Sequence, residues 1–240
     1  GKPQWEPERD FGFADNRFMY NRGHWKKFED TPDGPRVAAR QGNRPTYAVA
    51  GADDKSFSTD WLADKTIECI RANKDKPFFL YMSHYAIHAP WEADSTFYNH
   101  YTGRDLSDFE AIYASMIEGM DNSLGDLMEK LKEQGQWENT ILIFMSDNGQ
   151  PKQATRNKPL RGHKLLPYEG GIRVPLIVYW PGVVKKGSHN DQYVLVDDLY
   201  PTILEMAGVN FRNKIIQEVD GRSFVPFLED PELRNEDRPL

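Results

Sequence analysis

Two short apolar runs and the polar loop between them constrain the fold of this chain more than any other stretch. Thr140–Met145 and Val174–Trp180 each have about the length of a strand that is buried on both faces. The first run is followed directly by S-D-N-G, so that Asp147 and Asn148 stand where the strand should stop. Because ligands bind at the carboxyl ends of strands in open α/β sheets, we expect polar groups to gather there.

The same stretch carries oxygen ligands followed by cations. Asp147 and Asn148 offer oxygens of the kind that Ca²⁺ or Mg²⁺ takes. The loop then brings Arg161, His163 and Lys164, which can meet an anion. This order indicates a site for a phosphate or sulfate ester. However, S-D-N-G is also ordinary turn chemistry, because Asp, Asn and Gly all tolerate the dihedral angles of tight turns.

Composition narrows the class of protein. The 240 residues are 39% hydrophobic and 28% charged, which allows one full core without a split into two domains. The net charge of −7, with no run rich in Lys and Arg, argues against a nucleic-acid partner. No apolar stretch reaches the length of a membrane span. The single cysteine, Cys69, excludes an internal disulfide framework and is expected to lie on the apolar face of a helix.

The hydrophobic pattern predicts helices that alternate with strands. Ser58–Ala72 reads as a helix capped by Ser58 or Thr59, and Pro77–Met82 as a strand. The capping box S-D-F-E at 107–110 begins a long helix that Gly135 should end. A last helix is predicted over Asp197–Gly208. The predicted class is therefore α/β, with a mixed, mostly parallel sheet and helices on both faces.

Several sequence blocks, in this order and at these spacings, resemble the sulfatase family of the alkaline phosphatase superfamily. They are S-D-N-G (146–149), N-K-P-L-R-G-H-K (157–164), Y-E-G-G-I-R-V-P (168–175) and W-P-G (180–182). The likeness extends to F-F-L-Y-M-S-H-Y-A-I-H-A-P (78–90), D-L-Y-P-T-I-L-E-M-A-G-V (198–209) and D-G-R-S-F-V-P-F-L (220–228). It covers roughly residues 56–230. The resemblance implies an incomplete alkaline-phosphatase-like fold and hydrolysis of a sulfated carbohydrate or an aryl sulfate.

The resemblance also implies roles for particular residues. Asp147 and Asn148 match the Asp-Asn metal ligands of the family, which implies Ca²⁺, with Mg²⁺ as the alternative. Lys164 stands four residues before Tyr168, where the family has its sulfate-binding lysine. His88 matches the histidine that faces the sulfate and the leaving oxygen. His88 and Lys164 are therefore the predicted catalytic and substrate-binding residues.

Two parts of the family's site do not occur as such in these residues. The family nucleophile is a formylglycine made from C-x-P-x-R or S-x-P-x-R, and neither motif is present here. The Asp-Asp metal ligands after the first strand are also missing, since Asp197-Asp198 aligns with a helix start. We therefore expect residues 1–230 to form the C-terminal-proximal part of a sulfatase catalytic domain, followed by a tail or linker at 231–240. The N-terminal segment and its nucleophile would lie outside this chain, which alone should be inactive.

Two other functions remain open from the sequence. One is a non-catalytic domain that binds sulfated glycans through Lys164 and His88. The other is a phosphoesterase of the same superfamily, which would need more His and Asp ligands for two zinc ions. Among minor features, Gly170-Gly171 suggests a turn with positive φ, Lys2 weakly resembles the start of a sulfate-binding block, and His24 is an unplaced polar residue in a loop.

Overall fold

The computed structural model describes residues 13–14, 24–26, 28–31, 34–37, 56–154, 157–210 and 217–234. Contacts between Cα atoms divide the chain into two compact units. Unit 1 comprises Gly1–Trp137 and Asn148–Arg173, and unit 2 comprises Glu138–Asp147 and Val174–Leu240. Lys2 and residues 235–240 lie outside the described residues. The expected division at residue 230 therefore stays a prediction.

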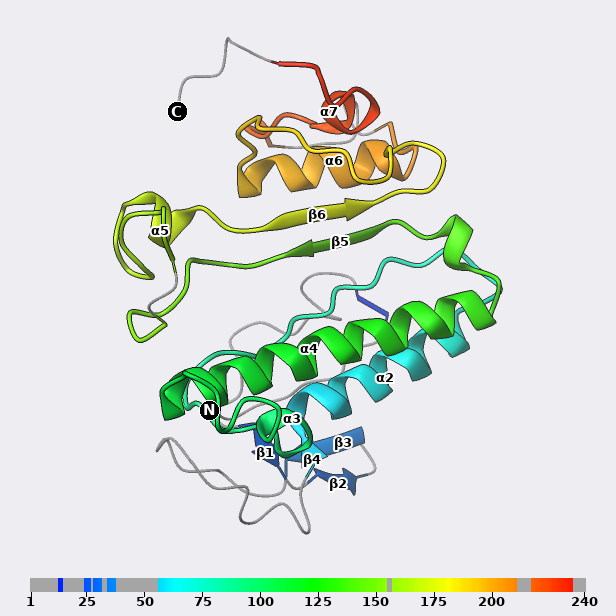
Figure 1. Ribbon diagram of the computed structural model, residues 1–240. Helices are drawn as coiled ribbons and strands as arrows, with labels where there is room; N and C mark the ends of the chain where they lie inside the picture. Colours follow the sequence, from blue (N-terminus) through cyan, green and yellow to red (C-terminus); the bar gives the residue numbers. More distant parts are fainter. Residues whose placement is uncertain are drawn as a thin grey trace. The chain divides into compact units, whose positions relative to one another are not determined.

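The centre of unit 1 is a pair of helices that lie side by side, α2 (Ser58–Ala72) and α4 (Asp108–Glu133) (Figure 1). The predicted bounds of α2 are confirmed, but its predicted cap is wrong. The N-cap is Phe57 and no side chain caps the helix, because Ser58 and Thr59 are already helical and buried. In place of a cap, the backbone N–H of Ser58 donates to the carbonyl of His24 at 2.7 Å.

The long helix α4 begins and ends as its sequence predicts. The hydroxyl of Ser107 accepts from the N–H of Glu110 at 3.3 Å, and the Glu110 carboxylate accepts from the N–H of Ser107 at 3.0 Å. Gly135 follows the last turn with φ of +69°, a conformation that favours glycine. The buried face of α4 contributes Ile112 and Met116 to one apolar group, with Phe57 and Ala93, and Leu127 and Leu131 to another, with Ile70. None of the described helices combines the length and the apolar character needed to cross a membrane.

The strands of unit 1 are short. β1 (Trp25–Lys26) pairs with β4 (Ser56–Phe57), and β2 (Phe28–Thr31) pairs with β3 (Gly34–Val37), both antiparallel. The predicted strand Pro77–Met82 is not a strand, because its backbone has no ladder partner among the described residues. Leu80 and Met82 pack on the apolar group around Ile70, whereas the alternate residues Phe79 and Tyr81 are 62% and 72% exposed.

Unit 2 is built on the two apolar runs. β5 (Leu142–Met145) pairs antiparallel with β6 (Leu176–Tyr179), with Leu142 opposite Tyr179 (Figure 1). The predicted strands are confirmed, but all three pairings in the described part of the chain are antiparallel, unlike the mostly parallel sheet expected. Parallel pairing needs a long crossover, usually a helix, and the described connection between these strands holds only the four-residue α5 (Glu169–Ile172). The short turns η1 (Trp137–Asn139) and η2 (Val196–Asp198) and the helices α6 (Leu199–Met206) and α7 (Val225–Glu229) complete the described elements.

Asp198 joins the start of α6 to the segment before α7. It is 1% exposed, and its two carboxylate oxygens accept from the N–H groups of Leu195 and Arg222, each at 2.8 Å. The hydroxyl of Thr202 donates to the carbonyl of Asp198 and accepts from the N–H of Phe224. Asp198 stands at the N-cap of α6, as its resemblance to a helix start implied, and its carboxylate is occupied by backbone donors.

Among the described residues of unit 1, Asp94 is the carboxyl group with the most strongly raised pKa. It caps α3 (Ser95–Tyr98), where one carboxylate oxygen accepts from the N–H of Thr96 at 3.1 Å. The other oxygen is buried and has no hydrogen-bond partner among the described residues. Burial, with a smaller contribution from Asp60, raises the pKa of Asp94 from 3.8 to about 6.

The pKa of Asp94 predicts a pH-dependent effect of Asp94→Asn. The folded state holds this proton between pH 3.8 and 6 while the unfolded chain releases it, so ionised Asp94 destabilises the fold above about pH 6. Asn keeps the capping oxygen and removes the charge. Its effect on the free energy of unfolding should be more favourable at pH 8 than at pH 4, by about 1–2 kcal/mol. Urea denaturation at both pH values measures this difference, and an effect independent of pH would contradict it.

Candidate active site

Residues 148–173 of unit 1 form a loop that closes on itself through backbone hydrogen bonds. The N–H of Lys164 donates to the carbonyl of Gln150 at 2.8 Å, and that of Gly149 donates to the carbonyl of Gly171 at 2.9 Å. The N–H of Gly170 donates to the carbonyl of Arg161 at 2.7 Å. We call these three bonds the backbone clasp. The clasp places Lys164 beside the residues that directly follow Asn148.

The clasp depends on glycine for space. The prediction that Gly170 and Gly171 need positive φ is wrong, because both lie in the short helix α5 and neither has a positive φ. A Cβ atom on Gly170 would overlap with the carbonyl oxygen of Gly162, and one on Gly149 would overlap with the carbonyl oxygen of Gly170. The backbones therefore approach more closely than any side chain allows.

Polar side chains reinforce the same loop. The amide of Asn157 donates to the carbonyls of Gly162 and Gly170 at 3.0 and 3.1 Å. The guanidinium of Arg161 lies 3.9 Å from the ring centroid of Tyr168 and donates to its hydroxyl at 3.1 Å. Arg173 pairs with Glu169 at 3.7 Å. Both arginines therefore hold the loop together.

Lys164 is half-buried, whereas Lys152 and Lys158 of the same loop are exposed. Its backbone is fixed by the clasp, and the ring of the adjacent His163 donates from Nδ1 to its carbonyl at 2.8 Å. Across the residues that the structure describes, its ammonium forms no ion pair. An anion that reached Lys164 would therefore not have to displace any carboxylate of the described residues.

His88 is exposed and has a defined tautomer. Its Nδ1 lies 2.7 Å from the carbonyl oxygen of Ala89. Since a carbonyl only accepts, Nδ1 carries the proton and Nε2 is the nitrogen left for a ligand. By contrast, Nδ1 of the nearby His84 is buried with no partner in the described part of the chain, and burial lowers the pKa of His84. The lowered pKa favours the neutral form of His84.

Asp147 and Asn148 follow the end of β5. The N–H of Ser146 donates to the carbonyl of Pro175 at 3.4 Å, which continues the pairing of β5 with β6 to the residue before Asp147. Asp147 is exposed and ends a segment of unit 2, whereas the half-buried Asn148 begins a segment of unit 1. Their side-chain oxygens are of the type that binds hard cations such as Ca²⁺. They are too few to hold it alone, because Ca²⁺ takes six to eight oxygen ligands. No group of three or more His, Cys, Asp or Glu side chains in the described residues could hold a metal ion.

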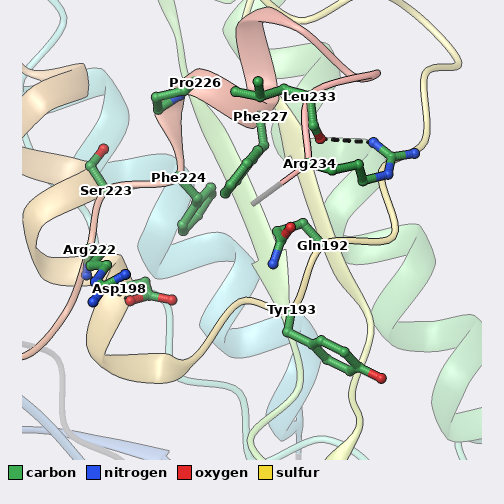
Figure 2. Close-up of a pocket in the computed structure, with 10 residues that line it drawn as sticks. All are labelled: Gln192, Tyr193, Asp198, Arg222, Ser223, Phe224, Pro226, Phe227, Leu233 and Arg234. Atoms are coloured by element: carbon green, nitrogen blue, oxygen red, sulfur yellow. Dashed lines mark hydrogen bonds between the residues drawn. The ribbon is translucent and has the colours of Figure 1, made fainter. Parts of the chain in front are cut away.

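Unit 2 contains a cavity of about 350 Å³ that the sequence did not indicate (Figure 2). Phe224, Phe227 and Leu233 give it an apolar wall, and Arg222 and Arg234 are also among its lining residues. A second cavity of about 420 Å³ lies beside Asp197. Neither cavity is lined by any predicted site residue.

The sequence also missed a residue of unit 1 that contacts the His88 segment. His24, left unplaced above, is fully buried, and its Nε2 lies 2.8 Å from the carbonyl oxygen of His88. No motif could have found it, because this contact joins residues 64 positions apart.

Comparisons with known proteins agree with the sequence blocks. The Sulfatase family model matches residues 10–209. A sulfatase from Formosa agariphila is 36% identical over 216 residues, which are 84% of this chain and 38% of that protein. Arylsulfatase J of Mus musculus is 35% identical over 179 residues, 73% of this chain and 29% of that protein. The chain thus spans well under half the length of these relatives.

A solved structure supports the fold. The crystal structure of Ps i-CgsB superposes with a TM-score of 0.67 at 33% identity, over 75% of this chain and 40% of that chain. This likeness confirms the predicted α/β class of the sulfatases within the alkaline phosphatase superfamily. With a family match over most of its length, the chain belongs to the sulfatase family.

Proposed function

We propose that this chain is part of the catalytic domain of a sulfuric ester hydrolase. Family membership supports the reaction class. The observation that carries the proposal is the backbone clasp, which brings Lys164, a lysine with no ion-pair partner in the described part of the chain, beside the residues that follow Asn148. The formylglycine nucleophile and the remaining metal ligands would come from residues outside this chain, since the match covers only 38% of the Formosa agariphila relative and 40% of Ps i-CgsB.

The chemistry of each predicted site residue permits a particular role in this reaction; these residues are Lys164, His88, Asp147 and Asn148. Lys164 binds the oxygens of the sulfuryl group as a cation. His88 presents Nε2 to the leaving oxygen and, when protonated, donates a proton to it. Asp147 and Asn148 supply two of the oxygen ligands of Ca²⁺, or of Mg²⁺ as the alternative. The bound cation would stabilise negative charge on the ester oxygens.

The names of similar proteins support a sulfated carbohydrate as substrate, with an aryl sulfate as the simpler alternative. Ps i-CgsB has been solved in complex with k-i-k-neocarrahexaose, and that chain is 33% identical to this one. N-acetylgalactosamine-6-sulfatase of Homo sapiens is 32% identical over 175 residues. Both names concern sugars, which agrees with the carbohydrate alternative.

The proposal is tested by comparing two lengths of the protein. The longest natural form that contains this chain should hydrolyse 4-nitrophenyl sulfate, lose activity in a chelator and regain it with Ca²⁺. The 240 residues alone should hydrolyse nothing, and turnover by them would contradict the division. Two further outcomes would support the alternatives. Tight binding of a sulfated oligosaccharide without turnover by either form indicates a binding domain, and two bound zinc ions with phosphate-ester turnover indicate a phosphoesterase.

A further inference from the structure

We propose that His24 is a positioning residue for His88. Through a hydrogen bond from its buried ring it holds the turn at residues 85–89, so that the His88 ring keeps its proton on Nδ1 and presents Nε2 to the substrate. This inference rests on the proposed function, because the residue that His24 positions, His88, is the one proposed to face the leaving oxygen.

The contacts of His24 fix its own tautomer. Its side chain has no exposed surface, and its Nε2 lies 2.8 Å from the carbonyl oxygen of His88. That oxygen only accepts, so Nε2 of His24 carries the proton. Nδ1 then accepts from the hydroxyl of Ser58, which lies 3.4 Å away. The backbone N–H of His24 donates to the buried carboxylate of Glu92. His24 is therefore held by Ser58 and Glu92, and its Nε2–H group donates to the carbonyl of His88.

The segment that His24 contacts needs support, because its backbone is strained. Ile87, directly before His88, has φ of +62°, which is a genuine outlier for a β-branched residue. Such a conformation is unfavourable and persists only where surrounding contacts impose it. The side chain of Ile87 packs on the apolar group that contains Phe57. The ring of His24 stacks on Phe57, with centroids 5.4 Å apart. The packing of Ile87 and the hydrogen bond from His24 therefore hold the strained turn together.

Tyr85 connects His24 to the ring of His88. Its ring centroid lies 5.1 Å from that of His24 and 5.2 Å from that of His88. Its hydroxyl donates to the carbonyl of Ala89 at 2.5 Å, the same oxygen that accepts from Nδ1 of His88. A carbonyl with two donors keeps its position, so the acceptor that fixes the His88 tautomer is itself fixed. A shift of the turn would disturb both bonds to this oxygen.

The test uses two variants of similar shape in the longest natural form of the protein. His24→Gln keeps an N–H donor near the position of Nε2, and His24→Met has a similar length but no donor. We expect kcat for 4-nitrophenyl sulfate to stay within about threefold of wild type in His24→Gln. In His24→Met it should fall by roughly 10–100-fold with KM little changed, because small misplacements of a catalytic group lower rates by such factors. The same Met substitution at the exposed His100 is the control and should leave kcat unchanged.

A second readout does not depend on turnover. Nitrogen-15 NMR of the His88 ring should show the proton on Nδ1 in wild type and in His24→Gln, and a mixture of tautomers in His24→Met. Equal kcat values for the Gln and Met variants, together with an unchanged His88 tautomer, would overturn the inference. If wild type hydrolyses no sulfate ester, the proposed function fails and the NMR comparison alone decides about His24. If His24→Met does not fold, His24→Leu replaces it in the same comparison.

Discussion

Replacing Lys164 with alanine should lower kcat/KM for an aryl sulfate by about 10²–10³-fold, the effect of removing a preorganised group that stabilises charge in a transition state. The ammonium has no carboxylate partner among the described residues, so its loss should leave the free energy of unfolding nearly unchanged. Steady-state kinetics on the longest natural form, with thermal unfolding as a check, measure both effects.

A second lysine in the same loop provides the control for Lys164. Lys152 is exposed and lies outside the backbone clasp, so Lys152→Ala should keep wild-type kinetics. Equal losses in the two variants would show that the loop attracts anions through its overall charge, and the specific role of Lys164 would be wrong.

Gly170→Ala should produce the largest loss of stability of the substitutions considered. The added Cβ would overlap with two backbone carbonyls, those of Gly162 and Arg161, and with the amide of Asn157. Backbone atoms cannot rotate away as a side chain can, so the loop must shift. We expect the free energy of unfolding to fall by about 2–4 kcal/mol, at the upper end of the effect of overpacking. Activity should fall as well, because Lys164 is held by the same clasp.

Gly125→Ala is the matched control for Gly170→Ala. Gly125 lies within α4, has no positive φ, and a Cβ there would meet nothing within 4 Å. Alanine in a helix interior is favoured over glycine by roughly 0.5–1 kcal/mol, so this variant should be slightly more stable than wild type. Denaturant unfolding measures the free energy of unfolding of both variants. If Gly170→Ala is as stable as Gly125→Ala, the close packing of the clasp is not required.

Features encoded by neighbouring residues could be predicted from the sequence. The bounds of α2 and the capping box of α4 follow from local periodicity and local hydrogen bonds, and the structure confirms both. The segment Pro77–Met82 shows the limit of this approach. Its composition suits a strand, but a strand also needs a partner, and none lies beside it in the described residues.

The residues of the candidate site also differ in how far they could be predicted from the sequence. Lys164 and His88 stand in blocks of sequence that resemble a family, so they could be named in advance. The role of Gly170 was misjudged, because a glycine needed for space and a glycine needed for positive φ look identical in a sequence. His24 could not be found at all, since its contacts with Glu92 and His88 join residues 68 and 64 positions apart.

The backbone clasp has a consequence for how substrate preference can change. Its three bonds join only main-chain atoms, so it places no demand on the identity of the exposed side chains at 152 and 153. Those positions can vary while the backbone of Lys164 stays bonded to that of Gln150. Under the proposed function, the backbone that positions the anion-binding lysine is separate from the exposed side chains that are left to contact the alcohol, so specificity can change while the clasp stays the same.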